Sequence, residues 1–311
     1  MAAEMAEQPA AIAGLLARGS SDHAATYGRY LLELVGGRPV ALAAPSIHTL
    51  YRARVDHRGW LAIAISQSGQ TPDIVTALSS MRASGAATIA VANGAGTPLA
   101  GAADLALELE AGPERAVPAT KTFTTTLVAL ALVAEALGEV PWQPDELAAL
   151  PGEVERVLVD APSAAGVAER LDGADRVLVT ARGLLLGSAL ETALKVREAA
   201  SVFAEGISSA DLRHGPIAAV TRDFPVLAFA APGPLAGDLE DLALALRKRG
   251  ADVIVSAPGP RSPLPLPTAL PEALLPVAAA VRGQQVAWSL ATRRGLDPDR
   301  PEGLSKVTRT R

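Results

Sequence analysis

Cysteine is absent from the 311-residue sequence, which excludes disulfide bonds, thiolate metal sites and cysteine nucleophiles together. Aromatic residues are also scarce, at 3%, although hydrophobic residues reach 49%. The core must therefore be built mainly from alanine, leucine and valine, as in helix-covered parallel sheets. The four histidines, His23, His48, His57 and His214, show no close metal-ligand spacing. We expect neither a bound metal nor a cofactor.

Strong charge and long apolar runs are lacking too. The net charge is −5 and there is no basic tract, so nucleic-acid binding has little support. No apolar run approaches the roughly 20 residues that a membrane-spanning helix needs. The first residues also lack the basic and apolar regions of a signal peptide. We therefore expect a cytoplasmic enzyme or binding protein with no nucleic-acid or membrane partner.

A strand, a hydroxyl-rich turn and a helix are expected in succession over residues 60–81. Residues 60–65 form a short apolar run rich in strand formers, and apolar residues recur at helical spacing over 74–81. Thr71 suits the N-cap of this helix, and Pro72 suits its first position, where a missing N–H costs nothing.

The expected turn places the hydroxyl groups of Ser66, Ser68 and Thr71 at a helix N-terminus. Unpaired backbone N–H groups and aligned peptide dipoles favour a phosphate there. Because helix N-termini often carry serine and threonine without any ligand, a capped loop of ordinary serines stays open as the alternative.

Strands and helices are expected to alternate along the whole chain, which indicates doubly wound parallel sheets with ligands at the carboxyl ends of the strands. The strand–turn–helix order begins again at residue 176, where an expected strand is followed by Ala-Arg-Gly, as at residues 17–19. We expect strands at 40–44, 60–65, 87–92, 104–109, 176–181, 224–229 and 251–256, and helices at 24–35, 45–55, 74–81, 122–137, 185–200, 238–249 and 272–293. Two tandem α/β domains follow, at residues 1–150 and 151–296, with a C-terminal tail at 297–311.

A second functional stretch is the expected helix 185–200. Glu191, Lys195 and Glu198 stand at i, i+4 and i+7 and share one face. By itself this pattern favours a solvated Glu–Lys ladder worth a few tenths of a kcal/mol. His214 follows in an expected loop, beside Gly-Pro, and with a carboxylate of the helix it could offer a general acid–base pair.

Five stretches together resemble the sugar isomerase (SIS) domain family in its double-domain form. The likeness extends to the isomerase half of glucosamine-6-phosphate synthase and to stand-alone glucosamine-6-phosphate deaminases, and it implies two flavodoxin-like domains. The stretches are residues 17–21, 66–71, 120–124, 191–198 with 212–216, and 297–306.

The resemblance implies a set of residues that bind the substrate. The sugar phosphate would be held by the polar side chains of two turns, and Thr120 would lie near the sugar. Glu191 and Lys195, which share a helix face with the expected base, are counted with the substrate-binding residues. The residues of the two turns are Ser21, Ser66, Gln67, Ser68 and Thr71.

The resemblance also implies three catalytic residues. Glu198 resembles the base that moves a proton between C1 and C2 of the sugar. His214 resembles the ring-opening residue, which in the family reaches the site of a neighbouring subunit. Lys306 resembles the tail lysine that engages the open-chain carbonyl as a Schiff base. The likeness at His214 and the largely apolar run 272–290 lead us to expect a homodimer with a shared active site.

The sequence departs from the family in three respects. The glutaminase domain of the synthase is absent, and without cysteine its nucleophile cannot be present, so we expect no glutamine-driven amination. Ala119 stands where the synthase has a serine. The stretch before Ala17 is shorter than in the family, which compresses the expected first strand.

We therefore expect a phosphosugar aldose–ketose isomerase that converts glucosamine-6-phosphate to fructose-6-phosphate and ammonia. A fructosamine-type deglycase, an isomerase without amine chemistry and a non-catalytic sugar-phosphate-binding regulator stay open as alternatives.

Overall fold

The computed structural model describes residues 19–306, which form two compact units. The N-terminal unit contains residues 19–114, Lys121–Glu139 and the tail residues 305 and 306, and the C-terminal unit contains Arg115–Thr120 and Val140–Leu304. Each unit has its own parallel sheet. The domain bounds expected from the sequence, at residues 150 and 296, stay predictions.

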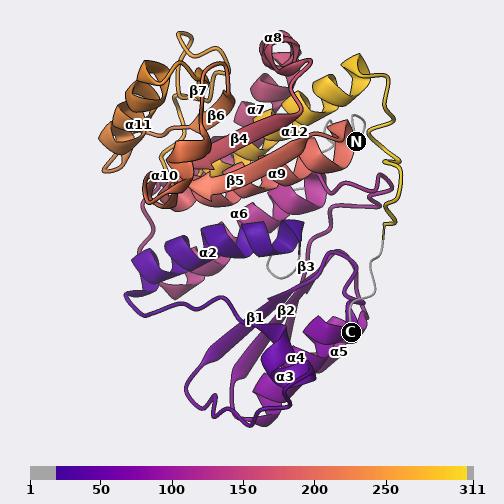
Figure 1. Cartoon of the computed structure of the whole chain (residues 1–311). Coiled ribbons are helices and arrows are strands. Elements are labelled where there is room, and N and C mark those ends of the chain that lie inside the picture. The colour runs from indigo at the N-terminus through magenta and orange to yellow at the C-terminus, as the bar shows by residue number, and fades with distance from the viewer. Residues whose placement is uncertain (1–18, 307–311) are drawn as a thin grey trace. The chain divides into compact units, whose positions relative to one another are not determined.

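The sheet of the N-terminal unit has three parallel strands in the order β1-β2-β3. Helices α4 and α5 pack on this sheet, and α2 packs against α6 (Figure 1). The strands are β1 (Leu61–Ile65), β2 (Ala87–Ala92) and β3 (Leu105–Glu108), and the helices are α2 (Ser20–Gly36), α3 (Pro45–Thr49), α4 (Pro72–Ala83), α5 (Pro98–Ala102) and α6 (Lys121–Leu137).

The sheet of the C-terminal unit has four parallel strands in the order β5-β4-β6-β7. The long helix α12 is buried along most of its length and packs against α7, α8 and α9 (Figure 1). The strands are β4 (Arg176–Ala181), β5 (Phe203–Ser208), β6 (Pro225–Phe229) and β7 (Asp252–Ser256), and the helices are α7 (Pro144–Val159), α8 (Ala161–Leu171), α9 (Leu186–Ala200), α10 (Ser209–Arg213), α11 (Ala236–Lys248) and α12 (Leu275–Arg293). Two parallel sheets with packed helices confirm the expected α/β fold class.

Three expectations for secondary structure are wrong. Residues 40–44 form no strand, and the helix expected at 45–55 ends at Thr49. Strand β5, by contrast, lies in a stretch that the sequence suggested to be a loop. Its apolar run is interrupted by Gly206, where an added Cβ would lie 2.8 Å from the Cα atom of Leu190. The strand therefore needs a glycine for the close approach of α9, and this same glycine hides the strand pattern. The strand expected to end at Ala17 lies outside the described residues.

The apolar length of α12 has a different reason from the one expected. The sequence suggested that its apolar run exceeds what one domain face needs to bury, and the run was therefore assigned to a dimer interface. In the structure most of this helix is buried by α7, α8 and α9 of the same unit. The helix therefore no longer supports a homodimer.

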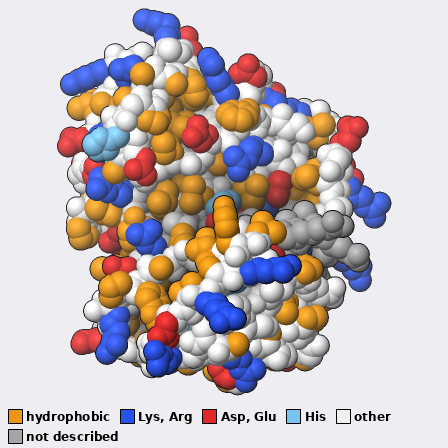
Figure 2. Space-filling model, turned by 60° about the horizontal axis from the view of Figure 1, so that its bottom comes forward, with side chains coloured by type: hydrophobic (Ala, Val, Ile, Leu, Met, Phe, Trp, Pro, Cys, Tyr) orange, Lys and Arg blue, Asp and Glu red, His pale blue; other side chains and the backbone are white. Residues whose placement is uncertain are grey.

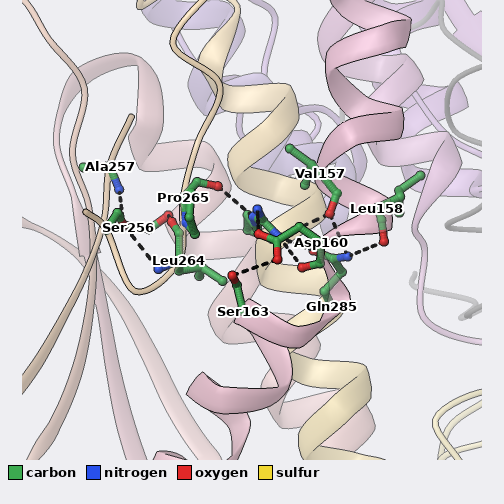
Figure 3. Close-up of polar contacts among 11 residues, drawn as sticks. Val157, Leu158, Asp160, Ser163, Ser256, Ala257, Leu264, Pro265 and Gln285 are labelled. Carbon is green, nitrogen blue, oxygen red and sulfur yellow. Dashed lines mark hydrogen bonds and ion pairs between the residues drawn. The ribbon is translucent and has the colours of Figure 1, made fainter. Parts of the chain in front are cut away.

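Arg282 of α12 fastens the end of α7. It is 2% exposed, and it donates to the carbonyl oxygens of Asp160 (2.9 Å) and Pro265 (2.8 Å) and to the carboxylate of Asp160 (2.6 Å). Gln285 donates to the carbonyl oxygens of Val157 and Leu158 (Figure 3). These bonds satisfy carbonyl groups at the end of α7 that have no partner within the helix.

The pKa of the Asp160 carboxyl reflects both its burial and its contact with Arg282. Partial burial by itself raises the pKa of the Asp160 carboxyl, but a hydrogen bond from Ser163 and the charge of Arg282 outweigh burial and hold the pKa below its ordinary value. A depressed pKa means that the ionised carboxylate stabilises the fold.

Replacing the charge of Asp160 should destabilise the C-terminal unit in a pH-dependent way. Asp160→Asn keeps the shape but removes the charge beside a buried guanidinium, and because the carboxyl is partly exposed we expect a loss of about 1–2 kcal/mol in the free energy of unfolding at neutral pH. A carboxyl with a depressed folded pKa contributes above its unfolded pKa of about 4 and loses that contribution as the pH falls. Urea unfolding should therefore show the full difference at neutral pH and a smaller one below about pH 4.

Asp172→Asn is the matched control, because both side chains of the Asp172–Arg293 pair are 40% exposed. The control should change the free energy of unfolding by less than about 0.5 kcal/mol. An equal loss in both variants, or a difference that does not vary with pH, would contradict the role given to Asp160.

Candidate functional site

The turn between β1 and α4 holds two hydroxyl groups together. Ser66 is buried, and its Oγ lies 2.9 Å from Oγ1 of Thr71. Thr71 is the N-cap residue of α4 and Pro72 stands in the first turn, as the sequence predicted. The Thr71 side chain makes no capping hydrogen bond and instead meets Ser66 across the turn.

The backbone of this turn is fixed in a shape that suits an anion. Gly69 has a φ of 62°, and an added Cβ would lie 2.4 Å from Oγ1 of Thr97, so the position needs glycine. The amide of Gln70 donates to Oγ of Ser68 at 3.2 Å. Within residues 19–306, the backbone N–H groups of Gln67, Ser68 and Thr71 donate no hydrogen bond. Such donors at the start of a helix favour a bound anion.

Asn93, whose role the sequence reasoning missed, ties this turn to the loop after β3. Its backbone N–H donates to the carbonyl of Gln67 at 3.0 Å. Its side chain accepts from the amide of Ala111 (2.9 Å) and donates to the carbonyl of Gly112 (2.7 Å). An asparagine just after a buried strand was the signal that could have revealed it.

Ser21 lies in the first turn of α2. Gly19 is the N-cap residue of this helix, and no side chain caps it. Ser21 makes no hydrogen bond to the Ser66–Thr71 turn within the described part of the chain. Ala17 and Arg18 of the same expected motif lie outside the described residues.

The loop before α6 contains a buried carboxylate that the sequence reasoning also missed. Glu114 accepts hydrogen bonds from the amide (3.1 Å) and the hydroxyl (2.6 Å) of Thr122, and its Oε2 lies 3.3 Å from Nζ of Lys306. Thr120, by contrast, belongs to the C-terminal unit, where it is buried and its carbonyl accepts from Gln284 at 3.2 Å.

Helix α9 buries two of the three charged residues that the sequence placed on one face. Lys195 Nζ lies 3.3 Å from the Glu191 carboxylate and directly contacts that of Glu198. The side chains of Glu191 and Lys195 are each 1% exposed, whereas that of Glu198 is 22% exposed. The solvated ladder is therefore wrong, and only the Glu198 carboxylate of the three has appreciable solvent access.

The charge balance on α9 is set by Lys195. Burial by itself lowers the pKa of the Lys195 ammonium, but the carboxylates of Glu191 and Glu198 outweigh burial and hold that pKa above its ordinary value. Lys195 is thus a fixed cation, which is not suited to acting as a base.

His214 is the C-cap residue of α10 and is exposed. Its backbone N–H donates to the carbonyl of Asp211, and its ring makes no hydrogen bond to Glu198 within residues 19–306. The structure therefore does not bring these two residues together as a hydrogen-bonded acid–base pair in one chain.

No group of three or more histidine, aspartate or glutamate residues between 19 and 306 is placed to hold a metal ion. No helix in that part of the chain is long and apolar enough to cross a membrane.

The SIS domain family matches residues 13–136 and 170–266. The chain belongs to this family. The aligned ranges contain the Ser66–Thr71 turn, helix α9 and His214, so the SIS regions include most of the residues described above.

The relatives of this SIS protein include isomerizing glutamine–fructose-6-phosphate aminotransferases. The one from Halobacterium salinarum is 35% identical over 309 residues, and the match covers 94% of this chain and 51% of the relative. The one from Streptomyces coelicolor is 36% identical over 313 residues. The chain thus spans about half the length of these aminotransferases.

Solved structures give the same family picture. A glucosamine-6-phosphate deaminase from Thermotoga maritima has a TM-score of 0.80 at 25% identity, with 94% of this chain and 88% of that chain covered. A phosphosugar isomerase candidate from Silicibacter pomeroyi has a TM-score of 0.78 at 33% identity, with 96% and 93% covered.

Removing the buried cation should destabilise the SIS protein. Lys195→Met leaves the Glu191 carboxylate without its buried counter-charge, and breaking a buried pair costs about 3–5 kcal/mol. Adding Glu191→Gln removes the uncompensated charge, so the double variant should regain a large part of that loss. Urea unfolding of the wild type and both variants measures the difference.

Lys248→Met is the matched control. Because Lys248 is exposed at the end of α11, this substitution should change the free energy of unfolding little. A double variant no more stable than Lys195→Met alone would show that lost packing, and not charge, explains the effect.

Proposed function

We propose that the chain is an aldose–ketose isomerase of amino-sugar phosphates, which converts glucosamine-6-phosphate and water to fructose-6-phosphate and ammonia. The observation that carries the proposal is the buried Glu191–Lys195–Glu198 set, in which only the Glu198 carboxylate has appreciable solvent access. A protein that only senses a sugar phosphate needs an anion turn but not a buried cation in contact with a partly exposed carboxylate.

The Ser66–Thr71 turn is proposed to bind the phosphate of the substrate. The hydroxyl groups of Ser66, Ser68 and Thr71, the side chain of Gln67 and the unpaired amides of the turn are neutral donors, and Ser21 is proposed to join them. No lysine or arginine lies within the turn. Neutral donors at a helix N-terminus can bind a phosphate by themselves.

Glu198 is proposed to transfer the proton. Its carboxylate takes the proton from C2 of the open-chain amino aldose, where the adjacent carbonyl makes that proton acidic, and returns it to C1. The product is the ketose with an imine at C2. Glu191 and Lys195, which the sequence counted as substrate-binding, are proposed to act by holding the Glu198 carboxylate in place through its contact with Lys195.

His214, Lys306 and Thr120 complete the proposed set. His214, which is exposed, opens the sugar ring. The neutral amine of Lys306 attacks C2 of the ketose imine and releases ammonia, and water then hydrolyses the new Schiff base to the ketose and the free lysine. Thr120 is proposed to lie near the sugar. The names of the deaminase and aminotransferase relatives support chemistry on amino-sugar phosphates.

A panel assay tests the reaction. Ammonia release should be detected with glucosamine-6-phosphate and should be absent with the unphosphorylated sugar. Glu198→Gln should lower kcat at least about 1,000-fold, because a missing general base removes the proton transfer. Exposed Glu205→Gln is the matched control and should leave kcat near that of the wild type.

The outcome also separates the alternatives. Ammonia-free interconversion of hexose phosphates would favour an isomerase without amine chemistry, and release of an amino acid from a sugar-phosphate adduct would favour a deglycase. Tight binding without any turnover would favour a regulator and would contradict the enzyme proposal.

The phosphate turn has its own test. Ser66→Ala and Thr71→Ala should each weaken the binding of a hexose 6-phosphate by about 1–3 kcal/mol, the scale of a hydrogen bond to a charged group. Calorimetry measures the affinity. Ser79→Ala is the matched control, because the Ser79 hydroxyl on α4 bonds only to the carbonyl of Val75. Unchanged affinity in both turn variants would show that the phosphate binds elsewhere.

A homodimer in the cytoplasm is proposed as the working form. Exposed His214 fits a residue that serves a neighbouring subunit, and the N-terminal unit exposes Leu50, Tyr51 and Trp60. Apolar side chains lie among charged ones on the face drawn in Figure 2. Exposed apolar patches are typical of interfaces. Sedimentation velocity at micromolar concentration should give twice the mass of one chain, and a monomer would contradict the shared site.

A further inference from the structure

A contact between distant parts of the sequence fixes the end of the described chain. Lys306 and Glu114 are 192 residues apart in sequence, and their Nζ and Oε2 atoms lie 3.3 Å apart within the N-terminal unit. The Glu114 side chain is fully buried and that of Lys306 is 25% exposed.

The carboxylate of Glu114 is held in place independently of Lys306. One oxygen accepts from the amide of Thr122, and the other accepts from the Thr122 hydroxyl. Thr122 is the second residue of α6, so the carboxylate also lies at the positive end of that helix dipole. The acceptor is therefore preorganised before the tail arrives.

The loop that carries Glu114 is also tied to the phosphate turn. Gly112, two residues before Glu114, accepts from the side chain of Asn93, and the amide of Asn93 donates to the carbonyl of Gln67. The turn and the buried carboxylate thus belong to one hydrogen-bonded region at the carboxyl ends of β1, β2 and β3.

We propose that Glu114 is the positioning residue of the tail lysine. Its fixed carboxylate binds the Lys306 ammonium and holds the tail against the N-terminal unit. The second half of this inference rests on the proposed function: with the tail fastened, Lys306 is positioned for the imine step, which begins when its ammonium gives up a proton to solvent, and the entropy of ordering the tail is removed from that step.

Chemical labelling of lysine tests the tail contact without any substrate. The chain has four lysines, Lys121, Lys195, Lys248 and Lys306, and exposed Lys248 serves as the internal reference. Acetylation with an N-hydroxysuccinimide ester, followed by peptide mass spectrometry, gives the labelling rate of Lys306 relative to Lys248. In Glu114→Gln this ratio should rise about tenfold, the scale of one lost charge-assisted hydrogen bond.

Glu302→Gln is the matched control, because it removes one negative charge from the exposed tail and should leave the ratio unchanged. Thr122→Val removes the hydroxyl that orients Glu114 and should raise the ratio by a smaller factor, whereas Thr122→Ser should restore it. These two variants keep the test valid if Glu114→Gln does not fold. A ratio unchanged in both Glu114→Gln and Thr122→Val overturns the proposal.

A kinetic measurement separates this inference from the proposed function. In Glu114→Gln, kcat for ammonia release should fall about tenfold while the affinity for a hexose 6-phosphate stays the same. If labelling rises but the wild type releases no ammonia from any amino-sugar phosphate, the tail contact stands and the proposed function fails. If labelling rises and kcat is unchanged, the role of Glu114 in presenting the amine is overturned.

Discussion

The buried ammonium group of Lys195 constrains how helix α9 of the C-terminal unit can fold and pack. A cation inside a protein persists only where carboxylates and hydrogen bonds replace its water. Glu191 and Glu198 supply the carboxylates from one turn before and one turn after, so α9 must be helical through all three positions. The same face must then be covered, and α12 covers α9.

The fit of α12 against α9 is tight. An added Cβ at Gly283 would lie 1.9 Å from the hydroxyl of Thr192, and the Ser188 hydroxyl donates to the carbonyl of Pro276 at 2.7 Å. On its other side α12 fastens the end of α7 through Arg282. One helix therefore packs closely against α9 and satisfies the open end of α7, which explains why it is apolar or hydrogen-bonded around most of its circumference.

The two units use the carboxyl ends of their strands differently. In the N-terminal unit, the turn after β1 offers hydroxyl and amide donors, and Asn93 and Glu114 brace the neighbouring loops. In the C-terminal unit, the turn after β4 is covered: an added Cβ at Gly183 would lie 2.5 Å from Cδ1 of Leu235. Parallel strands place both turns at the same kind of edge, but the second turn is packed against Leu235.

The sequence by itself determined the features that depend on neighbouring residues. Runs of apolar, strand-forming side chains predicted β2 and β4 at their observed bounds, and the Thr71-Pro72 pair predicted the start of α4. These signals can be read from the sequence because they depend only on residues a few positions apart. Only the tertiary structure decided what depends on packing. Glu191, Lys195 and Glu198 share a face in any helix, yet whether that face meets water or the protein interior is set by how other segments pack on α9. No pattern in the sequence indicated that Glu114 pairs with Lys306. Strand β5 was not predicted, because Gly206 is required by the close approach of the α9 backbone and not by the strand that contains it. Contacts between distant segments form only when the chain is folded, so no local pattern records them.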